Sequence, residues 1–178
     1  SDLRGRQHFL GRPGRSRGVT PLSPCAMNAP IHASAFAYKG AGCLVLGESG
    51  TGKSSLVASA LVHGATLIAD DRLTLHSEGG VLYADAVPEL KGVLELRQFG
   101  LVRCDKAVRA HPIHLVLELN PAAPIDRLPE QATREFCGIT LPYLQHPTTP
   151  PPAISALLIY LHAVHEKRLL PTDWRPGQ

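Results

Sequence analysis

A glycine-rich segment near residue 50 holds the residue types that bind phosphate groups. The pattern of a glycine, four variable positions and then Gly-Lys-Ser is met by Gly47-Glu48-Ser49-Gly50-Thr51-Gly52-Lys53-Ser54. Glycines let the backbone curl so that successive N–H groups point inward, and a helix that begins at Ser54 adds the positive end of its dipole. We predict that this loop binds the phosphates of a nucleotide, with Lys53 reaching the β- and γ-phosphates and Ser54 ligating Mg²⁺.

The segments on either side of the loop have the patterns of a strand and a helix. The apolar run Cys43–Leu46 enters the loop, and small and apolar residues continue from Ser55 to Val62 after it. A phosphate-binding loop of this kind lies between a strand and a helix. The alternative interpretation of the same residues is a glycine-rich turn that binds no ligand. The flanks favour the phosphate-binding interpretation.

Two adjacent carboxylates offer a second set of chemical groups. Asp70 and Asp71 directly follow the apolar run Ala65–Ala69, 17 and 18 residues after Lys53. An isolated Asp-Asp pair often marks a solvated turn. At the end of a strand that follows a phosphate loop, however, such carboxylates hold Mg²⁺ or activate the attacking group. We therefore predict that this pair belongs to an active site.

Length, composition and charge indicate one folded domain behind a basic N-terminal segment. The chain has 178 residues, of which 44% are hydrophobic, and it contains no apolar stretch long enough to span a membrane. The net charge of +3 divides unevenly, because residues 1–30 hold five arginines and one aspartate, or +4, which leaves −1 for the rest. Because the folded part is nearly neutral, we expect neither a nucleic acid nor a membrane as its partner.

The segment of residues 1–30 is rich in Gly, Pro, Arg and Ser and has too few apolar residues to form a core. Such a segment can contact nucleic acid or act as a transit peptide. Because Met27 is the only methionine, we favour a disordered or non-native tail over 1–30, with 1–26 upstream of the native start. We predict the folded domain over residues 31–170 and a second tail at 171–178. The absence of a hydrophobic signal segment predicts a cytoplasmic location.

Cysteine spacing excludes two kinds of site. The four cysteines are Cys25, Cys43, Cys104 and Cys137, and no two of them form a Cys-x-x-Cys pair. This spacing does not fit a metal–thiolate site, and a disulfide framework is not expected in a chain of this size. We expect Cys43, in the strand that enters the loop, to be a small buried side chain.

Hydrophobic patterns predict a series of strands and two helices. The expected strands lie at 31–38, 43–46, 65–69, 73–76, 81–83, 91–97, 113–119 and 138–141, and the expected helices at 54–62 and 153–169. Prolines make residues 122–130 a loop and exclude regular structure from 147–152.

The phosphate loop, the run Leu67–Asp71 and the segment Glu95-Leu96-Arg97 with Gly100-Leu101 resemble the C-terminal catalytic domain of HPr kinase/phosphorylase. The resemblance covers residues 31–169 and leaves no counterpart for the family's separate N-terminal domain. It implies an α/β, P-loop-containing fold with a phosphoenolpyruvate carboxykinase-like mixed sheet and a C-terminal helix. It also implies a homo-hexameric protein-serine kinase that uses ATP and Mg²⁺ to phosphorylate HPr, a phosphocarrier of the phosphotransferase system.

The resemblance assigns catalytic roles to His32, Lys53, Asp71 and Arg127, and metal-ligand roles to Ser54 and Glu95. In the family pattern, Asp71 matches the carboxylate that takes the serine proton, and His32 matches an active-site histidine. The chemistry is consistent, because a carboxylate can orient and deprotonate a hydroxyl. Lys53 and Arg127 can offset the charge that develops on the transferred phosphoryl group.

Two segments depart from the family pattern. Gln98 replaces a glycine in Glu-Ile-Arg-Gly-Leu-Gly, which disfavours a tight turn there. Residues 143–147, Tyr-Leu-Gln-His-Pro, replace Val-Arg-Pro-Gly-Arg and lack both arginines that serve the reverse, phosphorylase direction. The two anions that meet in that reaction repel each other unless cations lie between them. We therefore expect the kinase direction to dominate over a weak phosphorylase activity.

Other functions fit the phosphate loop as well. One alternative is a P-loop phosphotransferase or NTPase that acts on a small molecule, and another is a nucleotide sensor that binds without transfer. The sequence also leaves open whether the donor is a nucleotide or pyrophosphate.

Overall fold

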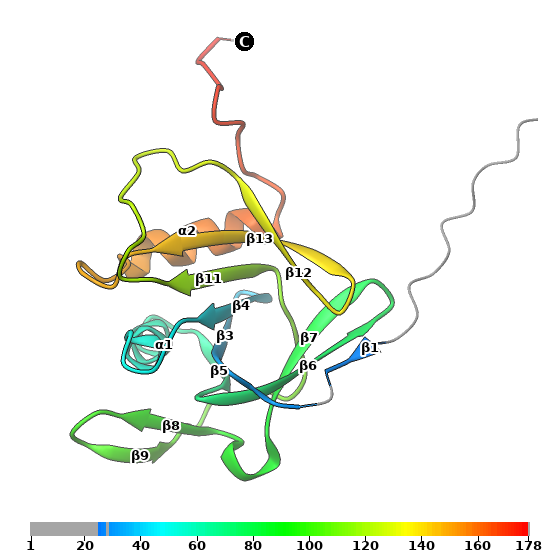
Figure 1. Ribbon diagram of the computed structural model, residues 1–178, viewed down its shortest axis with the longest axis vertical. Coiled ribbons are helices and arrows are strands. Elements are labelled where there is room, and N and C mark those ends of the chain that lie inside the picture. Colours follow the sequence, from blue (N-terminus) through cyan, green and yellow to red (C-terminus); the bar gives the residue numbers. More distant parts are fainter. Residues whose placement is uncertain (1–24, 28, 178) are drawn as a thin grey trace, which may run out of the picture.

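The computed structural model describes residues 25–27 and 29–177. These residues form three layers (Figure 1). The two helices, α1 (Lys53–Val62) and α2 (Ile154–His165), cover one face of a central sheet, and a second sheet packs against the other face. In this described part, no helix is long and apolar enough to cross a membrane.

The central sheet is mixed, as the sequence predicts. Its strands are β3 (Ser34–Tyr38), β4 (Ala41–Leu46), β5 (Thr66–Ala69), β11 (Leu115–Leu119), β12 (Ala132–Phe136) and β13 (Ile139–His146). They lie in the order β12-β13-β11-β4-β3-β5, with β4, β11 and β13 parallel and the other pairs antiparallel. Every residue of β4 is buried, because layers cover both faces of the strand.

The second sheet is antiparallel. It contains β1 (Cys25–Ala26), β2 (Ile31–His32), β6 (Arg72–Glu78), β7 (Val81–Ala86) and β10 (His111–Pro112). After a short 3-10 turn, η1 (Pro88–Leu90), the strands β8 (Val93–Leu96) and β9 (Gly100–Arg103) form a separate hairpin. This hairpin extends from the body of the protein beside α1 (Figure 1).

Two hydrophobic cores hold the layers together. The core between the sheets includes Leu44, Ile68, Leu73, Leu75, Leu82 and Val116. The core between the central sheet and the helices includes Phe36, Val45, Val57, Leu67, Leu115 and Leu161. Neighbouring strand residues such as Leu44 and Val45 therefore serve opposite cores, which explains the unbroken apolar run before the phosphate loop.

The first predicted strand, residues 31–38, is divided between the two sheets. β2 pairs with β6, with His32 opposite Arg72, whereas β3 pairs with β4 and β5. The chain thus crosses from one sheet to the other at Ala33. This crossing places His32 beside the Asp70-Asp71 pair that precedes β6.

The last predicted helix is shorter than expected. It ends at His165 rather than near Leu169, because Lys167 adopts a left-handed backbone conformation with φ of 54°. The Lys167 N–H donates to the Val164 carbonyl at 3.1 Å, and the Arg168 N–H donates to the Ala163 carbonyl at 2.8 Å. This hydrogen-bond pattern is a Schellman cap, formed here without the usual glycine.

Three strands of the structure, β9, β10 and β12, are not predicted by the sequence.

The predicted boundary of the N-terminal tail needs correction. We expect disorder over residues 1–30, but β1 pairs with β6 and the Cys25 N–H donates to Ser77 Oγ at 3.3 Å. Strand addition at a sheet edge uses backbone hydrogen bonds, so the exposed side chains of β1 carry no apolar signal. The part of this prediction that falls on residues 1–24 and Asn28 lies outside the described residues.

A group of histidines packs between the start of β4 and the end of α2. The Gly42 N–H donates to His114 Nδ1 at 3.0 Å, and the rings of His114 and His165 meet edge to face with centroids 4.5 Å apart. Burial, followed by the nearby His165 and His111, lowers the pKa of His114 to about 4. The fold therefore favours the neutral form of this ring, which can accept the Gly42 hydrogen bond.

We expect the protein to lose stability as the pH falls from about 6.5 to about 4. In this window His114 binds a proton in the unfolded chain but not in the folded protein, so protonation favours unfolding. Thermal unfolding measured across this pH range tests the prediction. His114→Asn keeps an acceptor for the Gly42 N–H without titrating, so its melting temperature should fall less over the same range. An equal fall in both proteins would assign the effect to other groups.

Candidate active site

The predicted phosphate loop connects β4 to α1, and its glycines adopt conformations that other residues avoid. Gly47, Gly50 and Gly52 have φ values of 144°, 83° and 99°. A Cβ at Gly47 would lie 2.6 Å from Thr51 Oγ1 and 2.8 Å from the Leu119 carbonyl oxygen. The first glycine is therefore required both by its backbone conformation and by its neighbours. The helix begins at Lys53, one residue before the predicted start.

Lys53 is buried at the loop. Its Nζ donates to the carbonyl oxygens of Gly47 at 2.7 Å and Glu48 at 2.9 Å. Burial lowers the pKa of Lys53, and the negative charges of Asp71 and Asp70 oppose this effect. The amino group is thus held by two neutral acceptors, which a charged phosphate oxygen can replace.

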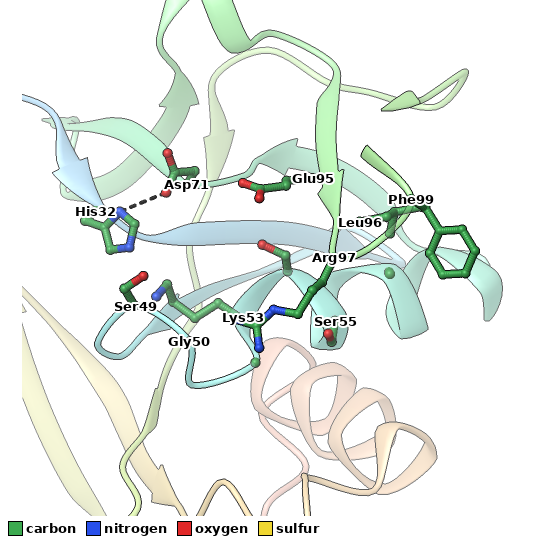
Figure 2. Close-up of a pocket in the computed structure, with 13 residues that line it drawn as sticks. His32, Ser49, Gly50, Lys53, Ser55, Asp71, Glu95, Leu96, Arg97 and Phe99 are labelled. Atoms are coloured by element: carbon green, nitrogen blue, oxygen red, sulfur yellow. Dashed lines mark ion pairs between the residues drawn. The ribbon is translucent and has the colours of Figure 1, made fainter. Parts of the chain in front are cut away.

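A pocket of about 390 Å³ opens beside the loop and the first turns of α1 (Figure 2). Its lining residues are His32, Ser49, Gly50, Gly52, Lys53, Ser54, Ser55, Ala58, Asp71, Glu95, Leu96, Arg97 and Phe99. They come from β2, the phosphate loop, α1, the end of β5 and the β8–β9 hairpin. The pocket therefore brings together every predicted catalytic and metal-binding residue except Arg127. The loop residues Gly47, Glu48 and Thr51 shape the loop but do not line the pocket.

His32 and Asp71 form a pair at one side of this pocket. His32 Nδ1 lies 2.9 Å from Asp71 Oδ1, and the two side chains are 47% and 44% exposed (Figure 2). Asp71 has a φ of 68°, a conformation that aspartate tolerates better than most residues. Its N–H donates to Ser34 Oγ at 3.4 Å, and its carbonyl accepts from the Ala33 N–H at 3.1 Å. The backbone thus directs an accessible carboxylate into the pocket with a histidine beside it.

The neighbouring carboxylate of Asp70 has a different environment. It is 2% exposed and accepts hydrogen bonds from Ser34 Oγ at 2.7 Å, from Ser54 Oγ at 2.8 and 3.0 Å, and from the Glu95 N–H at 3.0 Å. Asp70 therefore connects β3, the start of α1 and the β8 strand. The sequence marks the pair of carboxylates but does not distinguish the buried member from the exposed one.

The residues near Ser54 fit a magnesium ion. The Ser54 hydroxyl and the Asp70 carboxylate are in contact, the Glu95 side chain lines the same pocket, and all three supply oxygen donors. Among residues 25–27 and 29–177, no three or more His, Cys, Asp or Glu side chains form a group that could hold a metal ion by themselves. Mg²⁺ usually keeps several waters and binds through one or two carboxylates together with substrate phosphates, so a hydroxyl and two carboxylates match its needs.

The structure differs from the sequence prediction at two arginines. Arg127 is exposed in the loop between β11 and β12 and does not line the pocket, so its catalytic role stays a prediction. Arg97 does line it, and a Cβ on Gly50 would lie 3.7 Å from its guanidinium group. Figure 2 shows Arg97 extending from the hairpin toward the phosphate loop. The Glu-x-Arg segment contains the signal for Arg97, but the sequence cannot show that its side chain reaches Gly50.

The two segments that depart from the family pattern behave differently. Gln98 adopts a φ of 70°, and the Phe99 N–H donates to the Leu96 carbonyl at 2.9 Å, so the turn forms without glycine. The second segment, residues 143–147, lies mostly on β13, where Tyr143 and Gln145 donate hydrogen bonds to Glu118. The hydrogen bond from Tyr143 is the main cause that lowers the pKa of Glu118. Neither residue lines the pocket.

Comparison with known proteins identifies the family. The model of the HPr Serine kinase C-terminal domain matches residues 24–169 of this chain. The chain belongs to this family. The match begins before residue 31, in agreement with the pairing of β1, and it covers both the phosphate loop and the β8–β9 hairpin.

Individual members of the family are distant relatives. The HPr kinase/phosphorylase of Lactobacillus acidophilus is 32% identical over 128 residues, which cover 66% of this chain and 40% of that protein. The HPr kinase/phosphorylase of Malacoplasma penetrans is 28% identical over 131 residues, which cover 67% and 44%. The chain therefore spans about two-fifths of the length of these curated relatives.

A solved structure resembles the fold as well. The HPr(Ser) kinase/phosphatase from Coxiella burnetii superposes with a TM-score of 0.69 at 25% sequence identity. The superposition covers 79% of this chain and 99% of that chain. This likeness confirms the predicted fold of this chain, which is an α/β, P-loop-containing fold with a mixed sheet and a C-terminal helix.

The contrast between the two carboxylates predicts different effects on stability. Asp70→Asn places an amide donor against the Glu95 N–H or a serine hydroxyl, so it should lower the free energy of unfolding by about 2–3 kcal/mol. Asp71→Asn, the matched control, keeps a residue that tolerates the left-handed conformation and should cost less than about 1 kcal/mol. Urea denaturation of both variants measures the difference. Equal losses would contradict the structural role of Asp70.

Proposed function

We propose that this domain transfers the γ-phosphoryl group of ATP to a serine hydroxyl of an HPr-type phosphocarrier protein. The observation that carries the proposal is the position of the Asp71–His32 pair across the same pocket from Lys53. A proton acceptor and a phosphate-binding cation are the two groups that such a transfer requires. Family membership and the relatives that are named HPr kinases support HPr as the acceptor.

In the proposed reaction the serine oxygen attacks the γ-phosphorus, the bond to the β-phosphate oxygen breaks, and ADP leaves. Asp71 accepts the serine proton, and His32 at 2.9 Å keeps the carboxylate oriented. Lys53 and Arg97 both line the pocket at the phosphate loop, where their positive charges would stabilise the negative charge of the transition state. Mg²⁺, held by Ser54 with Asp70 and Glu95, would supply further positive charge at the phosphates.

We propose that the kinase direction dominates over a weak phosphorylase activity. Residues 143–147 contribute no arginine, and Gln145 and His146 do not line the pocket. Arg97 supplies one cation beside Lys53, which supports binding of the donor phosphates but leaves a second anion with little compensating charge. A cytoplasmic location and assembly as a hexamer stay predictions.

The central test is incubation of the protein with HPr, ATP and Mg²⁺, followed by mass spectrometry to locate the phosphate. We expect phosphoserine on HPr, and Lys53→Ala should abolish its formation because an apolar side chain cannot replace the cation. Lys106→Ala removes an exposed lysine outside the pocket and serves as the matched control. Transfer to a metabolite but not to HPr, or saturable ATP binding without turnover, would favour one of the other two functions.

Asp71→Asn separates proton transfer from binding. An amide can accept a hydrogen bond from the serine but cannot take its proton, so the transfer rate should fall by roughly 10²–10⁴-fold. The dissociation constant for ATP should stay close to that of the unaltered protein. If ATP binding is lost together with turnover, Asp71 would instead belong to the metal or phosphate site.

A further inference from the structure

We propose that the ring of Phe99 stacks on the base of the phosphoryl donor, which makes the donor a nucleoside triphosphate rather than pyrophosphate. The inference rests on the proposed function, because it concerns the donor that occupies the same pocket. Phe99 lies at the turn of the β8–β9 hairpin and is not among the residues that the sequence assigns to the site. Its role follows from three features of the pocket.

The first feature is that the two ends of the pocket differ chemically. Ser49, Gly50, Lys53 and the carboxylates lie at one end, and Phe99 lies at the other, with Arg97 between them (Figure 2). Pyrophosphate would use only the polar end. A nucleotide needs a polar end for its phosphates and an apolar surface for its base, which is the division that this pocket shows.

The second feature is the floor of the pocket between the two ends. Ser55 and Ala58 are three residues apart on α1, so they share one helix face, and both line the pocket. Ala58 follows Lys53 by five residues, which corresponds to about 7.5 Å along the helix axis. Their small side chains leave room for a ribose between the phosphate loop and the hairpin.

The third feature is how the hairpin presents the ring. The hydrogen bond from the Phe99 N–H to the Leu96 carbonyl closes a four-residue turn in which Gln98 takes the left-handed position. Leu96 packs against the core beneath the helices and anchors one end of the turn. Phe99 is nevertheless 86% exposed, so a large aromatic surface lies open at the edge of the pocket. In proteins that bind single-stranded nucleic acids, aromatic side chains stack on bases of any identity, because every base has a π-face.

A control residue for Phe99 lies on the same hairpin. Leu101 is also apolar and is 72% exposed, but it does not line the pocket. Binding of a nucleotide in the pocket would involve Phe99 and not Leu101.

The test measures dissociation constants for Mg²⁺-ATP and for Mg²⁺-tripolyphosphate, which has the phosphates without the nucleoside. Phe99→Ala should weaken ATP binding by roughly 5- to 100-fold, as expected for the loss of one stacked base. The same variant should bind tripolyphosphate unchanged, and Leu101→Ala should bind both ligands like the unaltered protein. Circular dichroism of each variant checks that the fold is retained.

A fluorescent variant gives an independent measurement. Trp174 is the only tryptophan of the chain, so Phe99→Trp in a Trp174→Phe background has a single reporter at the hairpin. This variant should keep its affinity for ATP, because tryptophan also stacks on bases. Its emission should change on addition of ATP and stay constant on addition of tripolyphosphate.

Three results would overturn the inference. If Phe99→Ala binds ATP normally while HPr is still phosphorylated, the stacking role fails and the kinase function stands. If that variant instead has a raised KM for HPr with unchanged ATP affinity, Phe99 contacts the protein substrate. If the unaltered protein binds tripolyphosphate as tightly as ATP, the pocket does not recognise the base. Binding of neither ligand would remove the proposed function together with the inference.

Discussion

The buried carboxylate of Asp70 is the interaction on which the geometry of the site depends. It lies at the end of β5 and accepts hydrogen bonds from Ser34 on β3, Ser54 on α1 and the Glu95 N–H on β8. Four segments that are distant in sequence thus meet at two oxygen atoms. A buried carboxylate is stable only when its acceptor sites are filled, so these segments must keep their positions together. One residue therefore links the start of α1, the proposed metal ligands Ser54 and Glu95, and the hairpin.

The backbone at the site also departs from ordinary conformations. Asp71 and Gln98 both have left-handed φ values without being glycine, and both lie next to the pocket. Such conformations cost free energy and persist when the surrounding structure determines them. At Asp71 the left-handed conformation directs the exposed carboxylate toward His32. At Gln98 the same conformation turns the chain between Arg97 and Phe99. Lys39, Cys137 and Lys167 adopt the same range of φ away from the pocket, so the conformation by itself does not mark the site.

The sequence predicts the parts of this protein that local patterns determine. The glycine spacing predicts the phosphate loop, and apolar runs predict β4, β5, β11 and α1, because burial and helix periodicity are properties of consecutive residues. Contacts between distant segments are not encoded in such patterns. The role of Asp70, the approach of Arg97 to Gly50 and the absence of Arg127 from the pocket all depend on tertiary packing. Strand β1 cannot be predicted from the sequence, because an edge strand with exposed side chains has no hydrophobic signal.

The β8–β9 hairpin carries both a proposed metal ligand and the proposed base-stacking residue. It carries Glu95 at the polar end of the pocket and Phe99 at the apolar end, only four residues apart. The hydrogen bond from the Glu95 N–H to Asp70 ties the first strand of the hairpin, β8, to the body of the protein. Because Asp70 also holds Ser54, a shift of the hairpin would move the proposed base-binding surface and the proposed metal ligands together. Binding of the base can therefore favour the hairpin position in which the groups around the phosphates are correctly placed.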